Sequence, residues 1–265
     1  FFFLFILYAV LIWGGDLIRT FCDATMTQAF IFIGLVMGVL LFLWRREIVF
    51  SRDDFTKWDV FFVLLLTLIY LLHSLFPTRD WDVISYHILH FQQLPWNQVT
   101  ESFFPSTILH SHLFPLADRL SYPFYHFLGF RIGTILNLFV VGVVYIQIRE
   151  ILMGLLKNRE VPHWYCQVFA FCIMASLNVM LQMHSYYVDI RTVPILLFFM
   201  HEFINRDGVK SKNMLLFMAF CVGIEICFKM SAGIPLLLCV CYFLFASRKN
   251  VSVLLLSGGI ILALL

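Results

Sequence analysis

The chain contains 265 residues, of which 62% are hydrophobic and 13% are charged. Soluble globular domains are about 45–50% apolar and about 25% charged, so this composition excludes an ordinary soluble domain. A net charge of +2 over this length excludes the concentrated basic surface that nucleic-acid binding requires.

Nine apolar runs predict membrane-spanning helices, since a helix needs roughly 20 apolar residues to cross the hydrocarbon core. In chain order they cover residues 1–14, 27–44, 58–76, 128–148, 164–183, 192–204, 214–228, 233–246 and 251–265. The chain begins and ends inside such runs, so we expect a fragment that is truncated at both ends. Residues 1–265 are predicted to form a single transmembrane domain, an all-α polytopic helix bundle.

The Lys and Arg residues between these runs predict the orientation of the chain. Twelve of the 18 lie in one alternating set of connections and six lie in the other. The richer set is predicted to face the cytoplasm, which directs residues 15–26, 77–127 and 184–191 to the outer side. Residues 77–127 are the long member of this group and form a large first outer loop.

The outer loop at 77–127 is predicted to contain a short amphipathic helix that begins near Asp82. Ile84, Ile88 and Phe91 follow the i, i+4, i+7 spacing of an apolar stripe. Such a helix lies at the membrane interface, with its apolar side toward the lipid and its polar side toward the outer compartment. The polar side carries Asp82, Ser85, Tyr86, His90 and Gln93.

Two acidic residues on this outer side are candidates for a functional role. Asp82 is either a helix N-cap, a position that Asp favours, or a reactive carboxylate. Asp189 precedes an apolar run and is either a cap with Arg191 as its partner or a functional acid, because carboxylates near the bilayer are costly. The occurrence of both acids on one side favours a functional role for Asp82.

The stretch Trp-Asp-Val-Ile-Ser-Tyr-His-Ile at residues 81–88 resembles the W-D-x-x-x-Y-H signature of bacterial type-C (GT-C) membrane glycosyltransferases. These enzymes are relatives of the protein O-mannosyltransferases and the lipid A aminoarabinose transferases. The similarity continues at residues 103–107, 114–118, 129–137, 187–189 and 228–233. It covers about residues 58–246, and its first motif is the most specific one.

The resemblance implies an enzyme that transfers a sugar from a polyprenyl-phosphate donor to an acceptor glycan, lipid or protein, with inversion at the anomeric carbon. It implies Asp82 as the catalytic base, with Asp80 as the alternative, and Tyr86 and His87 as substrate-binding residues. Some relatives carry a second acid directly after the first, which this chain lacks, so that role would fall to Asp80 or Asp189. The implied location is the bacterial inner membrane, with the active face on the periplasmic side.

Three cationic residues are candidates for contact with the departing lipid phosphate, whose negative charge grows during transfer. Arg131, Arg191 and Lys229 lie near predicted outer ends of spans, where snorkelling anchors are the alternative interpretation. Lys229 also follows Glu225 by four residues, so these two side chains can neutralise each other within one helix.

The sequence assigns neither a cofactor nor a metal. The pair His110 and His112 does not have a known metal-ligand spacing, and the seven cysteines include no CxxC pair. Some distant relatives of the resembled family use a divalent metal at the two acids, but the residues here do not indicate one.

Two other functions also fit a polytopic membrane chain. A secondary transporter or flippase typically has interrupted helices and polar groups near the membrane midplane, and Pro194 and Pro235 lie in or beside predicted spans. A polysaccharide polymerase or ligase would use the same lipid-linked substrate but carry its catalytic residues on a later outer loop. The position of the acids at the outer edge favours the transferase.

Overall fold

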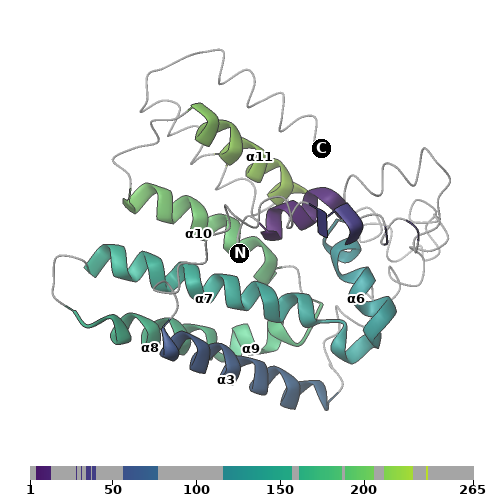
Figure 1. Ribbon diagram of the computed structural model, residues 1–265, viewed down its shortest axis with the longest axis horizontal. Coiled ribbons are helices and arrows are strands. Elements are labelled where there is room, and N and C mark those ends of the chain that lie inside the picture. The colour runs from purple at the N-terminus through teal and green to yellow at the C-terminus, as the bar shows by residue number, and fades with distance from the viewer. Residues whose placement is uncertain are drawn as a thin grey trace. The chain divides into compact units, whose positions relative to one another are not determined.

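The computed structural model describes residues 4–12, 28, 31, 34–36, 38–39, 56–76, 116–156, 161–186, 189–205, 212–228 and 237. Every regular element within these ranges is an α-helix, which confirms the all-α class for them (Figure 1). By its internal contacts the chain divides into two compact units. One is Phe1–Leu136 with His184–Tyr186, and the other is Asn137–Met183 with Tyr187–Leu265. The single transmembrane domain stays a prediction.

The first unit contains a helix at residues 4–12 together with α3 (Lys57–Ser74) and α6 (Leu116–Ile132). Tyr8 donates a hydrogen bond to the carbonyl oxygen of Leu120 in α6, at 2.8 Å. Tyr70 of α3 donates to the carbonyl oxygen of Ile132, at 3.0 Å. Hydrogen bonds from aromatic hydroxyls therefore connect α6 to the helix at residues 4–12 and to α3.

The second unit contains most of α7 (Ile135–Leu156), with α8 (His163–Met174), α9 (Leu177–Met183), α10 (Asp189–Asn205) and α11 (Lys212–Phe228). α10 packs against α9 and α11, and α8 packs against α9 (Figure 1). Gln147 of α7 donates a hydrogen bond to the carbonyl oxygen of Pro194 in α10, at 2.9 Å. α10 therefore contacts three other helices of its unit.

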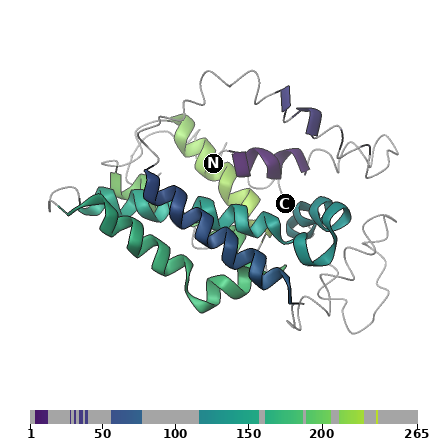
Figure 2. The same ribbon diagram turned by 60° about the horizontal axis from the view of Figure 1, so that its bottom comes forward.

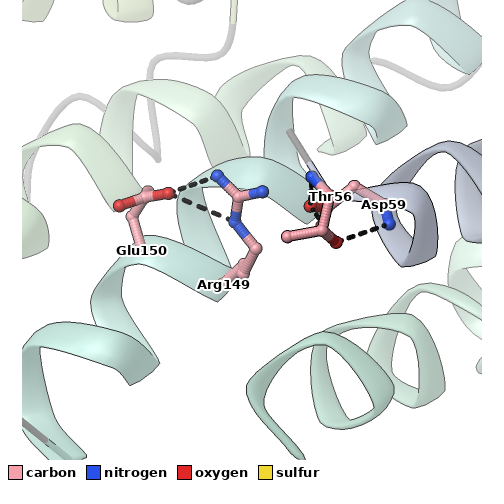
Figure 3. Close-up of polar contacts among 4 residues, drawn as sticks. All are labelled: Thr56, Asp59, Arg149 and Glu150. Atoms are coloured by element: carbon pink, nitrogen blue, oxygen red, sulfur yellow. Dashed lines mark hydrogen bonds and ion pairs between the residues drawn. The ribbon is translucent and has the colours of Figure 1, made fainter. Parts of the chain in front are cut away.

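The start of α3 is set by a capping box. The Asp59 N–H donates to Thr56 Oγ1 at 3.3 Å, and the Thr56 N–H donates to Asp59 Oδ2 at 2.9 Å (Figure 3). The first N–H groups of a helix have no intrahelical acceptor, and this reciprocal pair satisfies two of them. The helix predicted at 58–76 is confirmed, with bounds shifted by one or two residues.

Among the residues that the structure describes, two helices, α3 and α7, are long and apolar enough to cross a membrane, and the pair α8–α9 makes a third if it counts as one span. The buried side of α3 consists of Asp59, Phe62, Leu66, Tyr70 and Ser74. Its exposed side is also apolar and includes Phe61, Leu64, Leu68 and Leu71. A helix that is apolar on all sides suits a lipid environment better than water.

The apolar run at 164–183 forms two helices, so the prediction of one continuous helix is wrong. α8 and α9 are joined through a 66° bend (Figure 2). The Ala175 N–H bonds to the Phe171 carbonyl at 2.7 Å, and the Met180 N–H bonds to the Ser176 carbonyl at 3.0 Å. These bonds end α8 and begin α9, which lets the chain change direction between them.

The predicted helix at 128–148 is wrong at its start, because α6 ends at Ile132 and α7 begins at Ile135. Gly129 has a φ of 76°, a value that glycine adopts readily and residues with a Cβ rarely adopt. This residue interrupts the helical path inside α6. Since α6 begins at Leu116, the last part of the predicted outer loop is also helical.

α7 continues past its predicted end at residue 148 to Leu156. Arg149, predicted to lie in a cytoplasmic connection, is therefore inside the helix, with 3% of its surface exposed. Its Nε donates to Glu150 Oε1 at 3.1 Å, and the two side chains form an ion pair (Figure 3). The pairing offsets part of the hydration that a buried guanidinium loses.

The runs at 192–204 and 214–228 correspond to α10 and α11, each of 17 residues. The runs at 233–246 and 251–265 and the amphipathic helix near Asp82 lie outside the described residues, apart from residue 237. The run at 27–44 is described at a few separate residues, all of them helical.

Candidate functional site

Three of the predicted site residues lie in the described part of the chain: Asp189, Arg131 and Arg191. The other five lie outside it, namely Asp80, Asp82, Tyr86, His87 and Lys229. Their roles stay predictions. Described residues of the segments 129–137 and 184–192, which contain these three residues, form several polar contacts, each within one of the two units.

Asp189 is the first residue of α10 and is half-buried. Its backbone carbonyl accepts a hydrogen bond from Thr192 Oγ1, at 2.7 Å. A carboxylate in the first turn of a helix is stabilised by the helix dipole. This position fits the helix-terminal interpretation of Asp189, and it is equally compatible with a carboxylate held at the end of the helix for chemistry.

Arg191 lies in the first turn of α10 and is fully buried, with 0% of its surface exposed. Its Nε donates to Asn137 Oδ1 at 2.9 Å, and Asn137 Nδ2 donates to the Gln182 carbonyl oxygen at 2.9 Å. These two bonds join the starts of α7 and α10 to the end of α9. Because a buried guanidinium is costly unless it is hydrogen-bonded, this contact strongly constrains the position of α10.

Arg131 lies at the end of α6, and its environment is different. Its Nη1 donates to the carbonyl oxygen of Leu75 at 3.3 Å, at an exposed position. Leu75 is the C-cap of α3, where the last carbonyl groups have no intrahelical donor and a cation is favoured. Arg131 therefore caps α3 immediately before the predicted outer loop begins at residue 77.

The bend between α6 and α7, residues 129–134, is held by two buried tyrosines. Tyr186 donates to the Phe130 carbonyl oxygen at 2.8 Å. The hydroxyl of Tyr70 lies 3.0 Å from the Thr134 hydroxyl and donates to the Ile132 carbonyl, as described above. Both tyrosines are fully buried, so these carbonyl groups are satisfied without water.

Gly133 lies at the centre of this bend, where a larger residue does not fit. A Cβ at this position would lie 2.5 Å from the Tyr186 hydroxyl, 2.7 Å from the Gly129 carbonyl oxygen and 2.8 Å from Tyr125 Cα. Two of these three atoms belong to the backbone, so moving them away would cost considerable free energy. The sequence shows this glycine, but only the folded structure reveals why a side chain is excluded.

His184 is the first residue of the segment 184–192 and is also buried. Its ring centroid lies 6.0 Å from that of His73 and 6.4 Å from that of Tyr70. Within the described residues, no group of three or more His, Cys, Asp or Glu side chains could hold a metal ion.

The polar residues in these contacts that were not among the predicted site residues include Asn137 and Tyr186. Asn137 is an amide within an apolar run, and that is the signal by which the sequence could have indicated a buried polar contact. Tyr186 has no comparable signal, because a tyrosine near a helix end is equally suited to the membrane interface. Comparisons with protein-family models, with curated proteins and with solved structures return no match to this chain.

Proposed function

We propose that this chain is part of a membrane glycosyltransferase of the type-C class. The enzyme transfers a sugar from a polyprenyl-phosphate donor to an acceptor on the outer face of the membrane, with inversion and with an aspartate as base. The motif at 81–88 suggests this activity, and Asp82 is the proposed base, with Asp80 as the alternative.

One structural observation supports the proposal. The segments 129–137 and 187–189, which both carry the resemblance, are separated by about 50 residues in the sequence. The hydrogen bond from Arg191 to Asn137 joins the end of the first segment to the helix that begins at Asp189. A family motif spread over distant segments is expected to converge on one site, and this contact is consistent with that expectation.

The chemistry of the proposed reaction needs both an acid–base group and cations. A sugar hydroxyl is a weak nucleophile, and a carboxylate within hydrogen-bond reach can accept its proton as it attacks the anomeric carbon. The bond from that carbon to the lipid phosphate breaks, and nearby cations stabilise the released charge. Arg131 and Lys229 are proposed for this contact. The full burial of Arg191 favours a role in holding the start of α10.

The first test is the variant Asp82→Asn in the purified protein, assayed for lipid-phosphate release from a panel of polyprenyl-phosphate sugars. Removal of the base should lower kcat by about 10²- to 10⁴-fold while the protein still inserts and accumulates. Asp54→Asn, in a predicted cytoplasmic connection, is the matched control and should keep full activity. Normal turnover in Asp82→Asn, with the loss found instead in Asp80→Asn, would transfer the base role to Asp80.

A second candidate, a secondary transporter or flippase, is favoured by the break between α8 and α9 and by Pro194 inside α10. Interrupted helices are common at transporter binding sites. Reconstituted vesicles distinguish the two functions. Sugar transfer with lipid-phosphate release supports the enzyme, whereas movement of an intact lipid-linked sugar across the bilayer without release supports the flippase. The polymerase or ligase would extend a glycan that is already lipid-linked.

A further inference from the structure

An exposed cation lies where the end of α3 meets the end of α6, in the first unit. Two hydrogen bonds fix this place, which we call the α3–α6 corner and define as residues 70–76 with residues 131 and 132. Arg131 Nη1 donates to the Leu75 carbonyl oxygen at 3.3 Å, and Tyr70 donates to the Ile132 carbonyl oxygen at 3.0 Å. Consecutive residues of α6 are therefore attached to the last turns of α3, and the guanidinium is held at the end of that helix.

The guanidinium of Arg131 has more donors than its contacts in the described residues use. It carries five N–H groups and is exposed, and among the described residues it makes one hydrogen bond, through Nη1. No Asp or Glu occurs in residues 70–76 or 129–134. The C-terminal end of a helix carries only about half a negative charge, so Arg131 leaves the corner with a net positive charge.

The residues that flank Arg131 at this corner are apolar and exposed. Leu75 and Phe76, after the end of α3, expose 64% and 70% of their surface, and Ile132 exposes 43%. Large apolar side chains that cluster at a surface mark a site of interaction with a membrane or another molecule. A cation among them is typical of the boundary between hydrocarbon and water, where an arginine keeps its charged group beside the lipid phosphates.

An exposed apolar stripe leads from the corner along α3. It consists of Phe61, Leu64, Leu68, Leu71 and Leu75, which follow each other at spacings of three or four residues and therefore share one side of the helix. Each of them has at least half of its surface exposed. The 18 residues of α3 extend over about 27 Å, which is close to the thickness of the hydrocarbon core. The stripe therefore offers a hydrocarbon chain a continuous surface that ends at the corner.

We propose that the α3–α6 corner binds one anionic phospholipid of the bilayer, with its phosphate group at Arg131 and an acyl chain along the stripe on α3. A guanidinium suits this ligand, because two of its N–H groups can bind two phosphate oxygens at once. The net positive charge of the corner favours an anionic headgroup over a zwitterionic one. A polyprenyl phosphate has the same phosphate chemistry, and the experiments below distinguish it. Occupation by a phospholipid leaves Lys229 as the cation proposed for the donor.

The test of the headgroup is native mass spectrometry of the purified protein in mild detergent, with equal amounts of phosphatidylglycerol and phosphatidylcholine that have identical acyl chains. The parent should retain one phosphatidylglycerol with a preference of about fivefold, the contribution of one arginine near an anionic surface. Arg131→Gln should bring the ratio to about one. Arg131→Lys keeps the charge without the paired N–H groups and should give an intermediate ratio. Lys57→Gln removes one charge at the other end of α3 and, as the matched control, should keep the parent ratio.

The test of the acyl chain is Leu75→Gln in the same experiment. This variant keeps the backbone carbonyl that holds Arg131, and its side chain is largely exposed, so the fold should be retained. Both lipids should be retained less, at an unchanged ratio, because the chain contact serves either headgroup. Leu177→Gln, at an exposed position of α9, is the control and should retain lipid as the parent does. Thermal unfolding of each variant checks that it is folded.

Several outcomes would overturn the proposal. The first is a parent that retains the two phospholipids equally, and the second is an equal fall of the ratio in Lys57→Gln and Arg131→Gln, which would mean that net charge alone sets the preference. Unchanged retention in Leu75→Gln would show that the chain does not lie on α3.

A final arm adds polyprenyl phosphate in place of the phospholipids. If the parent binds it through Arg131 but shows no preference for phosphatidylglycerol, the corner belongs to the donor of the proposed transferase, and the phospholipid proposal is wrong. These measurements use no sugar transfer, so a failure of the transferase assay leaves their result unaffected.

Discussion

The bend between α6 and α7 and the buried carboxyl group of Glu225 on α11 differ in whether their buried polar atoms are hydrogen-bonded. In the bend, the carbonyl groups of Gly129, Phe130 and Ile132 each accept a hydrogen bond, from Gly133, Tyr186 and Tyr70 in turn. At the carboxyl of Glu225, one oxygen has no donor among the described residues. Buried polar groups are nearly always paired, so the first region follows the general rule and the Glu225 oxygen is an exception to it among the described residues.

The largest expected effect tests how rigid the bend is. Gly133→Ala should lower the free energy of unfolding by about 3 kcal/mol, because the added methyl group overlaps two backbone atoms that cannot move independently. Chemical or thermal unfolding in detergent measures the loss. Gly142→Ala, on α7 with nothing within 4 Å of the added Cβ, is the control and should be neutral or stabilising by up to about 1 kcal/mol. Equal stability of both variants would show that the bend accommodates the added methyl group at little cost in free energy.

The second prediction tests whether the second unit also contains a polar contact that contributes to stability. Asn137→Leu removes the acceptor of the Arg191 Nε and the donor to the Gln182 carbonyl. The loss of a bond to a buried charged group should destabilise the protein by about 2–3 kcal/mol, measured by the same unfolding experiment. Asn178→Leu, at an exposed position of α9, should change stability by less than about 0.5 kcal/mol. A similar small change in Asn137→Leu would mean that Arg191 is held by other groups.

Removal of one hydroxyl sharpens the comparison further. Tyr186→Phe keeps the ring and leaves the Phe130 carbonyl without its donor, which should cost about 1–2 kcal/mol. The control is Tyr165→Phe, because Tyr165 is about half exposed and stacks on Trp164. If the two variants have the same free energy of unfolding, water or another donor replaces the Tyr186 hydroxyl. Solvent would then reach the bend in spite of its burial.

The smallest effect is expected at a polar contact that is local in sequence. Thr56→Ala removes the side-chain half of the capping box of α3 and should cost about 1 kcal/mol. Thr67→Ala is the matched control, since Thr67 donates only to the Val63 carbonyl within its own helix and alanine favours helix. A loss at Thr56 no greater than that at Thr67 would show that the cap is replaced by solvent.

Among the described residues, the predictions from sequence were accurate for the presence of apolar helices and inaccurate where a helix is interrupted. α3 begins and ends within two residues of the predicted run, because a capping box and an apolar run are local signals. The sequence of the run at 164–183 does not indicate the break after Met174. It contains no proline or glycine at that point, and its residues are compatible with a continuous helix. The start of α7 was missed because Gly129 and Gly133 are ordinary helix residues in many membrane spans, and their role depends on what packs against them.

Of the candidate site, the sequence could indicate the residues but not their partners. Arg191 and Asp189 were recognised as charged groups at a predicted span end, whereas the contact of Arg191 with Asn137 was not. Glu225 was paired with Lys229 by helical spacing, and Lys229 lies outside the described residues, so that pairing stays a prediction.

The sequence by itself determined where the apolar helices lie and which ends carry the charged residues, because a backbone in apolar surroundings must satisfy its own hydrogen bonds and does so as helix. Only the tertiary structure decided which side chains meet. Asn137 and Arg191 are 54 residues apart, and Phe130 and Tyr186 are 56 residues apart. A hydrogen bond depends on distance and direction in space, and neither quantity is encoded in the spacing of residues along the chain.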